Sequence, residues 1–253
     1  MRMSQQTKFD FTLSRRAGFF AVLLVSPAAA MNVQPVVLDM SVAGASSKSS
    51  IQVINDSTKP LPVELVVQKL DLDEKGERLK KPAGDEFVLF PPQAIIPAGA
   101  AQVFRVQWVG EPELRKSQSY ILSVNQLPVK LRKEASGMQV VFNFEVVVNV
   151  APAGGEAVLK QIASEIAKDD HGVRRPAITV ENAGTMHAYL SEASLRIESG
   201  SWHKSLSASE LRQLIGLGLV QPGVRRRFLV PVDLPQGVSQ LSMSLDYKPK
   251  QAK

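Results

Sequence analysis

Cysteine is absent from this sequence of 253 residues. The chain therefore has no disulfide framework, no thiol nucleophile and no thiolate ligand for a metal. Its fold must be held by the burial of apolar side chains alone. A chain of this length can achieve that as two domains of about 100 residues each.

Long apolar runs are also lacking. The N-terminal run from Ala17 to Val25 is shorter than the stretch of about 20 apolar residues that spans a bilayer, and no later stretch approaches that length. We therefore expect no stable membrane insertion. A basic segment precedes this run, and a proline and three alanines follow it, which is the pattern of a secretory signal peptide. We assign residues 1–30 to a signal peptide for Sec export, with cleavage after Ala30.

Charge of one sign is only slightly in excess in the exported part of the chain. The whole sequence has a formal net charge of +6, with 30 basic and 24 acidic residues. Residues 1–30 contain four of those bases and one of those acids, so the mature chain has a net charge of +3. This small excess gives no indication of a nucleic-acid partner.

Catalytic and metal-binding motifs are lacking as well. The three histidines, His171, His187 and His203, have no second ligand at a metal-binding spacing. Ser201 and Lys204 match S-x-x-K, but no supporting motif accompanies them, and we interpret the match as chance. The sequence also lacks a nucleophile elbow, a P-loop and a dinucleotide fingerprint. We expect a protein that is not an enzyme and that has no catalytic residues, no metal and no cofactor.

Short alternating runs separated by turn residues fill the first half of the mature chain. Seven of them predict strands, over Val33–Asp39, Ser49–Asn55, Leu61–Asp71, Glu86–Phe90, Ala101–Val109, Tyr120–Leu127 and Met138–Val150. Seven short strands at this spacing favour an antiparallel sandwich of the immunoglobulin type.

A proline and two glycines interrupt this pattern between Ala151 and Gly155, where we place the domain boundary. Further strands are predicted over 157–166, 177–181, 188–197, 224–232 and 238–247, with a short helical turn over 209–217. The fold class that we expect is all-β, with two immunoglobulin-like β-sandwich domains in tandem, at residues 31–151 and 152–248.

The stretch from Met138 to Val150 is long for a single strand. Its first half is apolar on one face only, at Met138, Val140, Phe142 and Phe144, and its second half is apolar on both faces. Two interpretations are open. The stretch is an ordinary core strand, or its first half offers apolar side chains to a partner.

Six stretches of the mature chain form a series that is distinctive in its order and spacing. They are I-Q-V-I-N-D-S at 51–57, D-E-K-G-E at 73–77, F-V-L-F-P-P at 87–92, P-A-G-A-A-Q-V-F-R-V at 97–106, Y-I-L-S-V-N-Q-L-P-V at 120–129 and I-T-V-E-N-A-G-T-M-H-A at 178–188. Together they resemble the periplasmic pilus-assembly chaperones, which are two-domain immunoglobulin-like proteins of the PapD type.

This resemblance implies a periplasmic chaperone that binds pilus or fimbrial subunits by donor-strand complementation and delivers them to an outer-membrane usher. In that mechanism the chaperone lends a strand to a subunit whose own fold lacks its last strand. The donor residues would be Met138, Val140, Phe142 and Phe144. The expected partners are pilus-like subunits and the usher.

The chain departs from the family where members anchor the subunit's terminal carboxylate. They place an arginine in the first strand and a lysine in the long strand, and the aligned positions here are Val42 and Val147. Members also place an arginine before the proline that closes the long strand, where this chain has Ala151. Arg105 and Lys130 are candidate substitute anchors. Arg105 is otherwise a solvated or strand-pairing arginine, and Lys130 belongs to a basic loop.

Two other classes of function remain open from the sequence. A secreted two-domain immunoglobulin-like structural or adhesive protein would keep the long strand wholly internal and would cover its edge. An enzyme or sugar-binding module between the domains would need convergent polar groups there, and the sequence reveals none.

Overall fold

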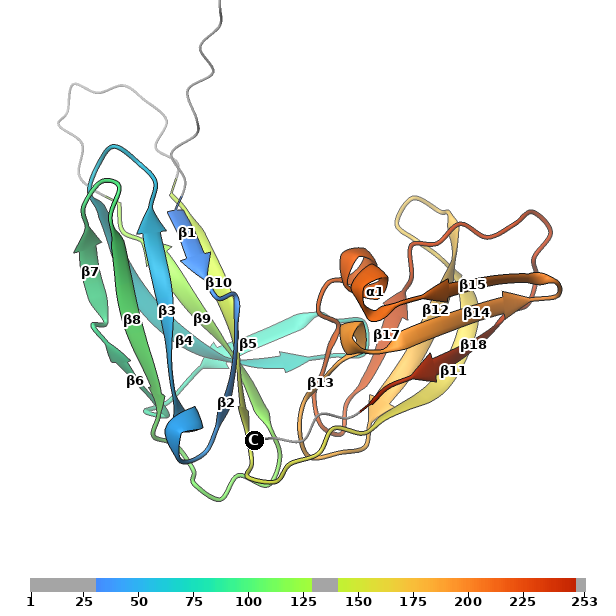
Figure 1. Cartoon of the computed structure of the whole chain (residues 1–253), viewed down its shortest axis with the longest axis horizontal. Coiled ribbons are helices and arrows are strands. Elements are labelled where there is room, and N and C mark those ends of the chain that lie inside the picture. The colour runs from blue at the N-terminus through green and yellow to red at the C-terminus, as the bar shows by residue number, and fades with distance from the viewer. Residues whose placement is uncertain (1–30, 129–140, 249–253) are drawn as a thin grey trace, which may run out of the picture.

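The computed structural model describes residues 31–128 and 141–248. It shows two β-sandwiches side by side, with β1 to β10 in one and β11 to β18 in the other, as Figure 1 shows. The fold class expected from the sequence, all-β with two immunoglobulin-like domains, is confirmed. In the described residues no helix is long and apolar enough to cross a membrane.

The first sandwich consists of a four-stranded sheet and a six-stranded sheet. The four-stranded sheet has the order β1 (Met31–Gln34), β3 (Lys48–Asn55), β8 (Ala101–Trp108), β6 (Phe87–Phe90). The six-stranded sheet has the order β2 (Val37–Ser41), β10 (Asn143–Ala151), β9 (Gln118–Gln126), β4 (Leu61–Leu72), β5 (Arg78–Pro82), and β7 (Gln93–Ile96) also pairs with β4. All of these pairings are antiparallel except the parallel pair of β2 with β10.

Alternating side chains explain how this sandwich closes. The strands turn one face inward, and the side chains there form a single buried core that includes Val53, Phe104, Leu122 and Val148. The stretch predicted as one strand from Val33 to Asp39 is in fact two strands. Pro35 carries no N–H for a ladder, and the chain passes there from the four-stranded to the six-stranded sheet.

The second sandwich is smaller. One sheet has the order β11 (Leu159–Lys168), β12 (Arg174–Asn182), β17 (Arg225–Leu229), and the other has the order β15 (Trp202–Leu206), β14 (Ser194–Ser199), β18 (Ser242–Asp246). A short pair joins β13 (Ala188–Tyr189) to β16 (Leu219–Val220). Its core includes Ile178, Leu195, Ile197 and Leu211.

In the described ranges, three short helices connect these strands. Two are single 3-10 turns, η1 (Ala45–Ser47) and η2 (Leu190–Glu192). The third is α1 (Ala208–Ile215), which agrees with the helical turn predicted over 209–217. It begins with a capping box, in which the Ser207 hydroxyl accepts from the Glu210 N–H and the Glu210 carboxylate accepts from the Ser207 N–H.

The two sandwiches meet across the outer face of the six-stranded sheet. A separate apolar cluster fills this contact and combines Val37, Leu70, Leu72, Ile121 and Val147 of the first domain with Tyr189, Leu217 and Leu219 of the second. The hairpin of β4 and β5 extends toward the second domain (Figure 1). Close to the turn of this hairpin, the Gln221 side chain accepts from the Leu72 N–H at 2.9 Å and donates to the Leu70 carbonyl at 2.7 Å.

Candidate functional site: a half-covered strand and the domain junction

Strand β10 is covered unequally on its two edges. Along one edge it pairs with β9 from Asn143 to Val150, and along the other it pairs with β2 only from Val147 to Ala151. Among the described residues, nothing pairs with the β2 side of β10 before Val147. The strand therefore offers an open edge, which is the kind of edge that accepts an added strand.

The direction of the backbone groups shows which N–H and carbonyl groups of β10 have no strand beside them. The Val147 N–H donates to the Val36 carbonyl at 3.0 Å, so the odd-numbered residues of β10 turn their backbone groups toward β2. Because these groups alternate along a strand, the N–H and carbonyl of Asn143 and Glu145 point to the same side, beyond the end of β2. These two residues provide a short unpaired ladder.

The side chains of β10 divide between the two faces of its sheet. Phe142 and Phe144 are partly buried against the first domain's own core, and Val146 and Val148 are fully buried there. Val141, Asn143 and Glu145 alternate with them. The phenylalanines that the sequence assigned to a client's groove therefore also contact the chain's own sandwich.

Glu145 is fixed on the outer face of β10 by two cations from β5. Arg78 donates to one carboxylate oxygen at 2.6 Å, and Lys80 binds the other. Burial raises the pKa of the Glu145 carboxyl, but the hydrogen bonds and charges of Lys80 and Arg78 outweigh that effect, and the pKa lies below its usual value. The ion pairs reach across β9 and β4, so they link β10 to β5 of the β4–β5 hairpin.

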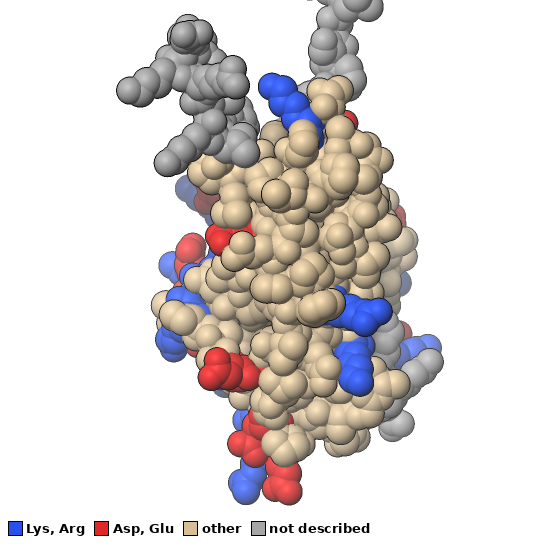
Figure 2. Space-filling view, turned by 90° about the vertical axis from the view of Figure 1, so that its left-hand side faces the viewer, with Lys and Arg blue, Asp and Glu red and all other residues tan. Residues whose placement is uncertain are grey.

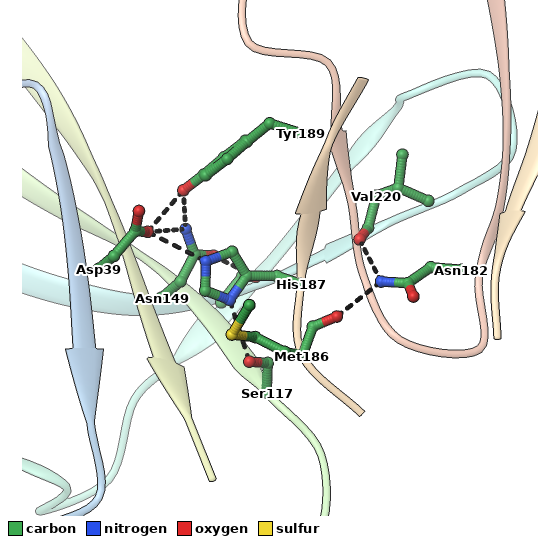
Figure 3. A network of polar contacts seen from close by, with 9 residues as sticks. Asp39, Ser117, Asn149, Asn182, Met186, His187, Tyr189 and Val220 are labelled. Carbon is green, nitrogen blue, oxygen red and sulfur yellow. Dashed lines mark hydrogen bonds and ion pairs between the residues drawn. The ribbon is translucent and has the colours of Figure 1, made fainter. Parts of the chain in front are cut away.

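At its other end β10 enters a polar network between the domains (Figure 3). Asn149, fully buried, donates from Nδ2 to the Tyr189 hydroxyl at 2.6 Å and to Asp39 Oδ1 at 3.2 Å, and its Oδ1 accepts from the Ser119 hydroxyl at 2.7 Å. The Tyr189 hydroxyl donates to the same Asp39 oxygen at 2.6 Å. Asp39 and Asn149 are register partners in the parallel pair of β2 with β10.

His187 extends this network from the second domain. Its Nε2 lies 3.1 Å from Asp39 Oδ1, and its Nδ1 lies 3.0 Å from the Ser117 hydroxyl. These contacts suit the tautomer in which Nε2–H donates to Asp39 and Nδ1 accepts from Ser117. Burial raises the pKa of the Tyr189 phenol, and the neighbouring Asp39 charge raises it further. The phenol therefore remains a hydrogen-bond donor at neutral pH.

The structure does not bring Arg105, one of the two sequence-predicted anchor residues, to this site. Arg105 lies on β8 in the other sheet, and its side chain is on the outer face together with the exposed Phe90 and Val103. Figure 2 shows the side of the first domain that lies to the left in Figure 1, where charged side chains are sparse at the centre. Lys130, Met138 and Val140 lie outside the described residues.

The two positions aligned with the family's anchor residues both lie among apolar side chains. Val147 packs in the apolar cluster between the domains, and Val42 packs against the first core. The sequence interpretation missed Asp39, Asn149, His187 and Tyr189. One signal was present, because Asn149 interrupts an otherwise apolar segment and is fully buried. A buried amide at such a place requires hydrogen-bond partners.

Among the described residues, no group of three or more histidine, aspartate or glutamate side chains is arranged to hold a metal ion. The polar side chains at the junction satisfy one another. Ser117, His187 and Asp39 form a chain of hydrogen bonds, in which the Ser117 and His187 side chains are buried between the domains.

Comparisons with known proteins agree with this architecture. Residues 31–156 match the family described as "Pili and flagellar-assembly chaperone, PapD N-terminal domain". No curated protein matches the chain in sequence.

Solved structures resemble the chain over most of its length. One is the CsuC–CsuE chaperone–tip adhesion subunit pre-assembly complex from archaic chaperone-usher Csu pili of Acinetobacter baumannii, with 16% identity, a TM-score of 0.53 and coverage of 86% of this chain and 97% of that chain. Another is the Salmonella enterica SafA pilin in complex with the SafB chaperone, with 14% identity, a TM-score of 0.53 and coverage of 81% and 86%. The YadV chaperone matches with 12% identity, a TM-score of 0.52 and coverage of 88% and 99%.

The fold and the half-covered strand define an all-β protein of two tandem immunoglobulin-like domains that presents a strand edge. The chain belongs to the PapD-like family of chaperone-usher pilus chaperones. The family is one of chaperones, so the expectation of a protein that is not an enzyme is confirmed by this membership.

Proposed function

We propose that this protein is a periplasmic chaperone that binds pilus or fimbrial subunits by adding the open edge of β10 to the subunit's sheet. The observation that carries this proposal is the unequal pairing of β10, which is covered by β9 from Asn143 onward and by β2 only from Val147. A protein in which the strand served the core alone would pair or blunt this edge.

The backbone supplies the sequence-independent part of the binding. Asn143 and Glu145 direct their N–H and carbonyl groups toward the open side, and a client strand would complete their ladder. Such bonds do not depend on the client's side chains. One chaperone can therefore serve several subunits.

The side chains supply the apolar part. Phe142 and Phe144 lie at the border between the chaperone's core and the open edge, and Met138 and Val140 precede them in the same alternation. Complete burial of one such side chain contributes about 1.5–3 kcal/mol. The half-buried phenylalanines would contribute less than this, which suits a complex that must later release its subunit.

The remaining parts of the proposal concern the route of the client. Residues 1–30 direct export, and the mature chain acts in the periplasm. It then delivers bound subunits to an outer-membrane usher. The chain is similar to chaperones solved together with a tip adhesion subunit and with a pilin, which supports a subunit as its client.

Replacing Asn143 with proline tests the strand-addition mechanism. Asn143→Pro removes an N–H on the open side, and no ladder bond to β9 uses that group. Asn143→Ala is the matched control, because it shortens the same side chain and retains the N–H. Each variant is co-expressed in the periplasm with pilin-like proteins encoded in the same genome, and subunit co-purification is measured together with the thermal melt.

We expect Asn143→Pro to lower the co-purified subunit about tenfold, with the melt of the chaperone unchanged within about 3 °C. Asn143→Ala should retain the subunit. Undiminished co-purification with Asn143→Pro would show that the open edge is not the binding site. An equal loss with Asn143→Ala would assign the effect to the side chain and contradict the backbone mechanism.

A further inference from the structure

The first half of β10, residues 143–146, is held less firmly than the half that follows it. The second half is paired on both edges, and its Val148 and Val150 are fully buried. The first half is paired on one edge only, and its Phe144 is partly buried. A strand end with one partner and incomplete burial opens easily. An edge that receives another strand must stay extended, because ordering it during binding would lower the affinity.

Two cations on β5 support this half where β2 does not reach it. Arg78 donates to Glu145 Oε2 at 2.6 Å, and Lys80 pairs with Oε1. Arg78 and Lys80 are alternate residues, so they lie on the same face of β5. The side chains of Lys80 and Glu145 are only 28% and 29% exposed, so salt screens this pair less than a fully exposed one. The contacts use the Glu145 side chain and leave its backbone groups available on the open edge.

Strand β5 is itself anchored to both domains. It pairs with β4 over its whole length, from Arg78 to Pro82. In the turn before it, the Glu74 carbonyl accepts from the Arg227 N–H of the second domain at 2.7 Å. The Gln221 side chain of the second domain bonds to the Leu72 N–H at the end of β4. The two cations therefore extend from a fixed support.

We propose that Arg78 and Lys80 are positioning residues for the client-binding edge. Through Glu145 they hold the first half of β10 extended, in the geometry that an added strand requires. This inference rests on the proposed function and names the residues that prepare its site. Because the cations act through Glu145, they need no charged group on the client. The binding of an uncharged strand therefore depends on them.

Three variants of the mature chain, residues 31–253, separate the charges from other properties of β5. Arg78→Gln combined with Lys80→Gln removes both charges and retains long polar side chains. Arg78→Lys combined with Lys80→Arg keeps both charges. Lys81→Gln is the matched control, because Lys81 is next to Lys80 on the same strand but pairs with Asp71 of β4. The thermal melt of each variant is recorded to establish that it is folded.

Native-state hydrogen exchange, measured by NMR, tests the support of β10 without a client. The N–H groups of Phe144 and Val146 point toward β9, since the odd-numbered residues of β10 face β2. We expect the uncharged double variant to exchange these two protons about fivefold faster than the unmodified protein. Val148 and Val150 should change by less than about twofold. The control and the charge-preserving variant should exchange like the unmodified protein.

A peptide tests whether this support serves binding. The probe is a fluorescein-labelled peptide of about ten residues that alternate valine and threonine, the pattern of a half-buried strand. It is acetylated and amidated and contains no charged residue, so a direct ion pair with Arg78 or Lys80 cannot contribute. By fluorescence anisotropy, the uncharged double variant should bind it about fivefold more weakly. The other two variants should bind it like the unmodified protein.

The possible failures separate this inference from the proposed function. Unchanged exchange at Phe144 and Val146, or unchanged peptide affinity, in the uncharged double variant would overturn the positioning role and leave strand addition intact. An equal loss with the charge-preserving variant or with Lys81→Gln would also overturn it, because the effect would not follow the charges that meet Glu145. Peptide binding that is insensitive to Asn143→Pro, or no binding to the unmodified protein, would instead overturn the proposed strand addition.

Discussion

Asn149→Ala should strongly destabilise the protein. The side chain is fully buried and makes three hydrogen bonds, to Tyr189, Asp39 and Ser119, at 2.6, 3.2 and 2.7 Å. Each such bond contributes about 0.5–1.5 kcal/mol net, and an unpaired buried hydroxyl at Ser119 adds a further cost. The free energy of unfolding should therefore fall by about 2–5 kcal/mol, and the melting temperature by about 5–15 °C.

The assay is urea unfolding of the mature chain, combined with a double-mutant cycle. Tyr189→Phe removes the hydroxyl that Asn149 contacts across the domain junction. We expect the two substitutions to be non-additive by at least about 0.5 kcal/mol, because they remove the same hydrogen bond. Asn143→Ala, on the exposed part of the same strand, is the control and should change the stability by less than about 0.5 kcal/mol.

Two results would refute this reasoning. A change of less than about 0.5 kcal/mol for Asn149→Ala would mean that the network stabilises neither domain. If the changes in the free energy of unfolding for Asn149→Ala and Tyr189→Phe were fully additive, Asn149 would act within the first domain only. The hydrogen bond between the domains would then contribute nothing to stability.

Three further predictions concern charge and packing. Glu145→Gln should lower the melting temperature at pH 7; since the folded pKa of Glu145 is depressed, the difference from the unmodified protein should vanish as the pH falls below about 4. All three tyrosines have raised pKa values, and that of Tyr247 is raised to about 12 by burial and by the charge of Glu192. Absorbance at about 295 nm should therefore show almost no phenolate in the folded protein at pH 10 and only about a tenth of Tyr247 as phenolate at pH 11, whereas urea-unfolded protein titrates near 10 and stability declines above that pH. Phenolate in the folded protein at pH 10 would contradict this. Gly184→Ala should cost about 2 kcal/mol or more in thermal or urea unfolding, because an added Cβ would lie 2.1 Å from the Glu156 carbonyl oxygen, whereas Gly84→Ala meets no atom within 4 Å; equal stabilities of these two variants would show that the close approach relaxes freely.

Alternation of apolar residues predicted those strands that lie wholly within one sheet. The predicted strand Ser49–Asn55 corresponds to β3, and Ala101–Val109 corresponds to β8. The stretch from 188 to 197 was predicted as one strand, but η2 divides it into β13 and the start of β14. Apolar side chains remain buried through the break while the backbone changes partners, at Ala188, Tyr189, Leu190, Ala193 and Leu195. A pattern of side chains does not reveal a change of backbone partner.

Strand β5 was missed for a different reason. Its sequence from Arg78 to Pro82 is basic and contains a proline, so no local preference favours a strand. It forms because its backbone pairs with the edge of β4 and because Arg78 and Lys80 form ion pairs with Glu145. Both of these causes are distant in sequence.

The same limit applies to the site. From the apolar face of the stretch and from the family resemblance, the sequence predicted a donor strand at Met138, Val140, Phe142 and Phe144, and this stays a prediction. The sequence could not indicate the Asp39 network, because Asp39 and His187 are 148 residues apart and meet only when the two domains pack.

The attachment of the domains at separate places has a mechanical consequence. Asp39 holds the second domain at β2, and Gln221 holds it at β4. The sheet order places β10 and β9 between these strands, so the two attachments are about 14 Å apart at the usual strand spacing. One attachment would act as a pivot, whereas two attachments with an apolar cluster between them resist rocking of one domain against the other. If subunits bind as proposed, a client strand on β10 would meet the second domain at a fixed angle.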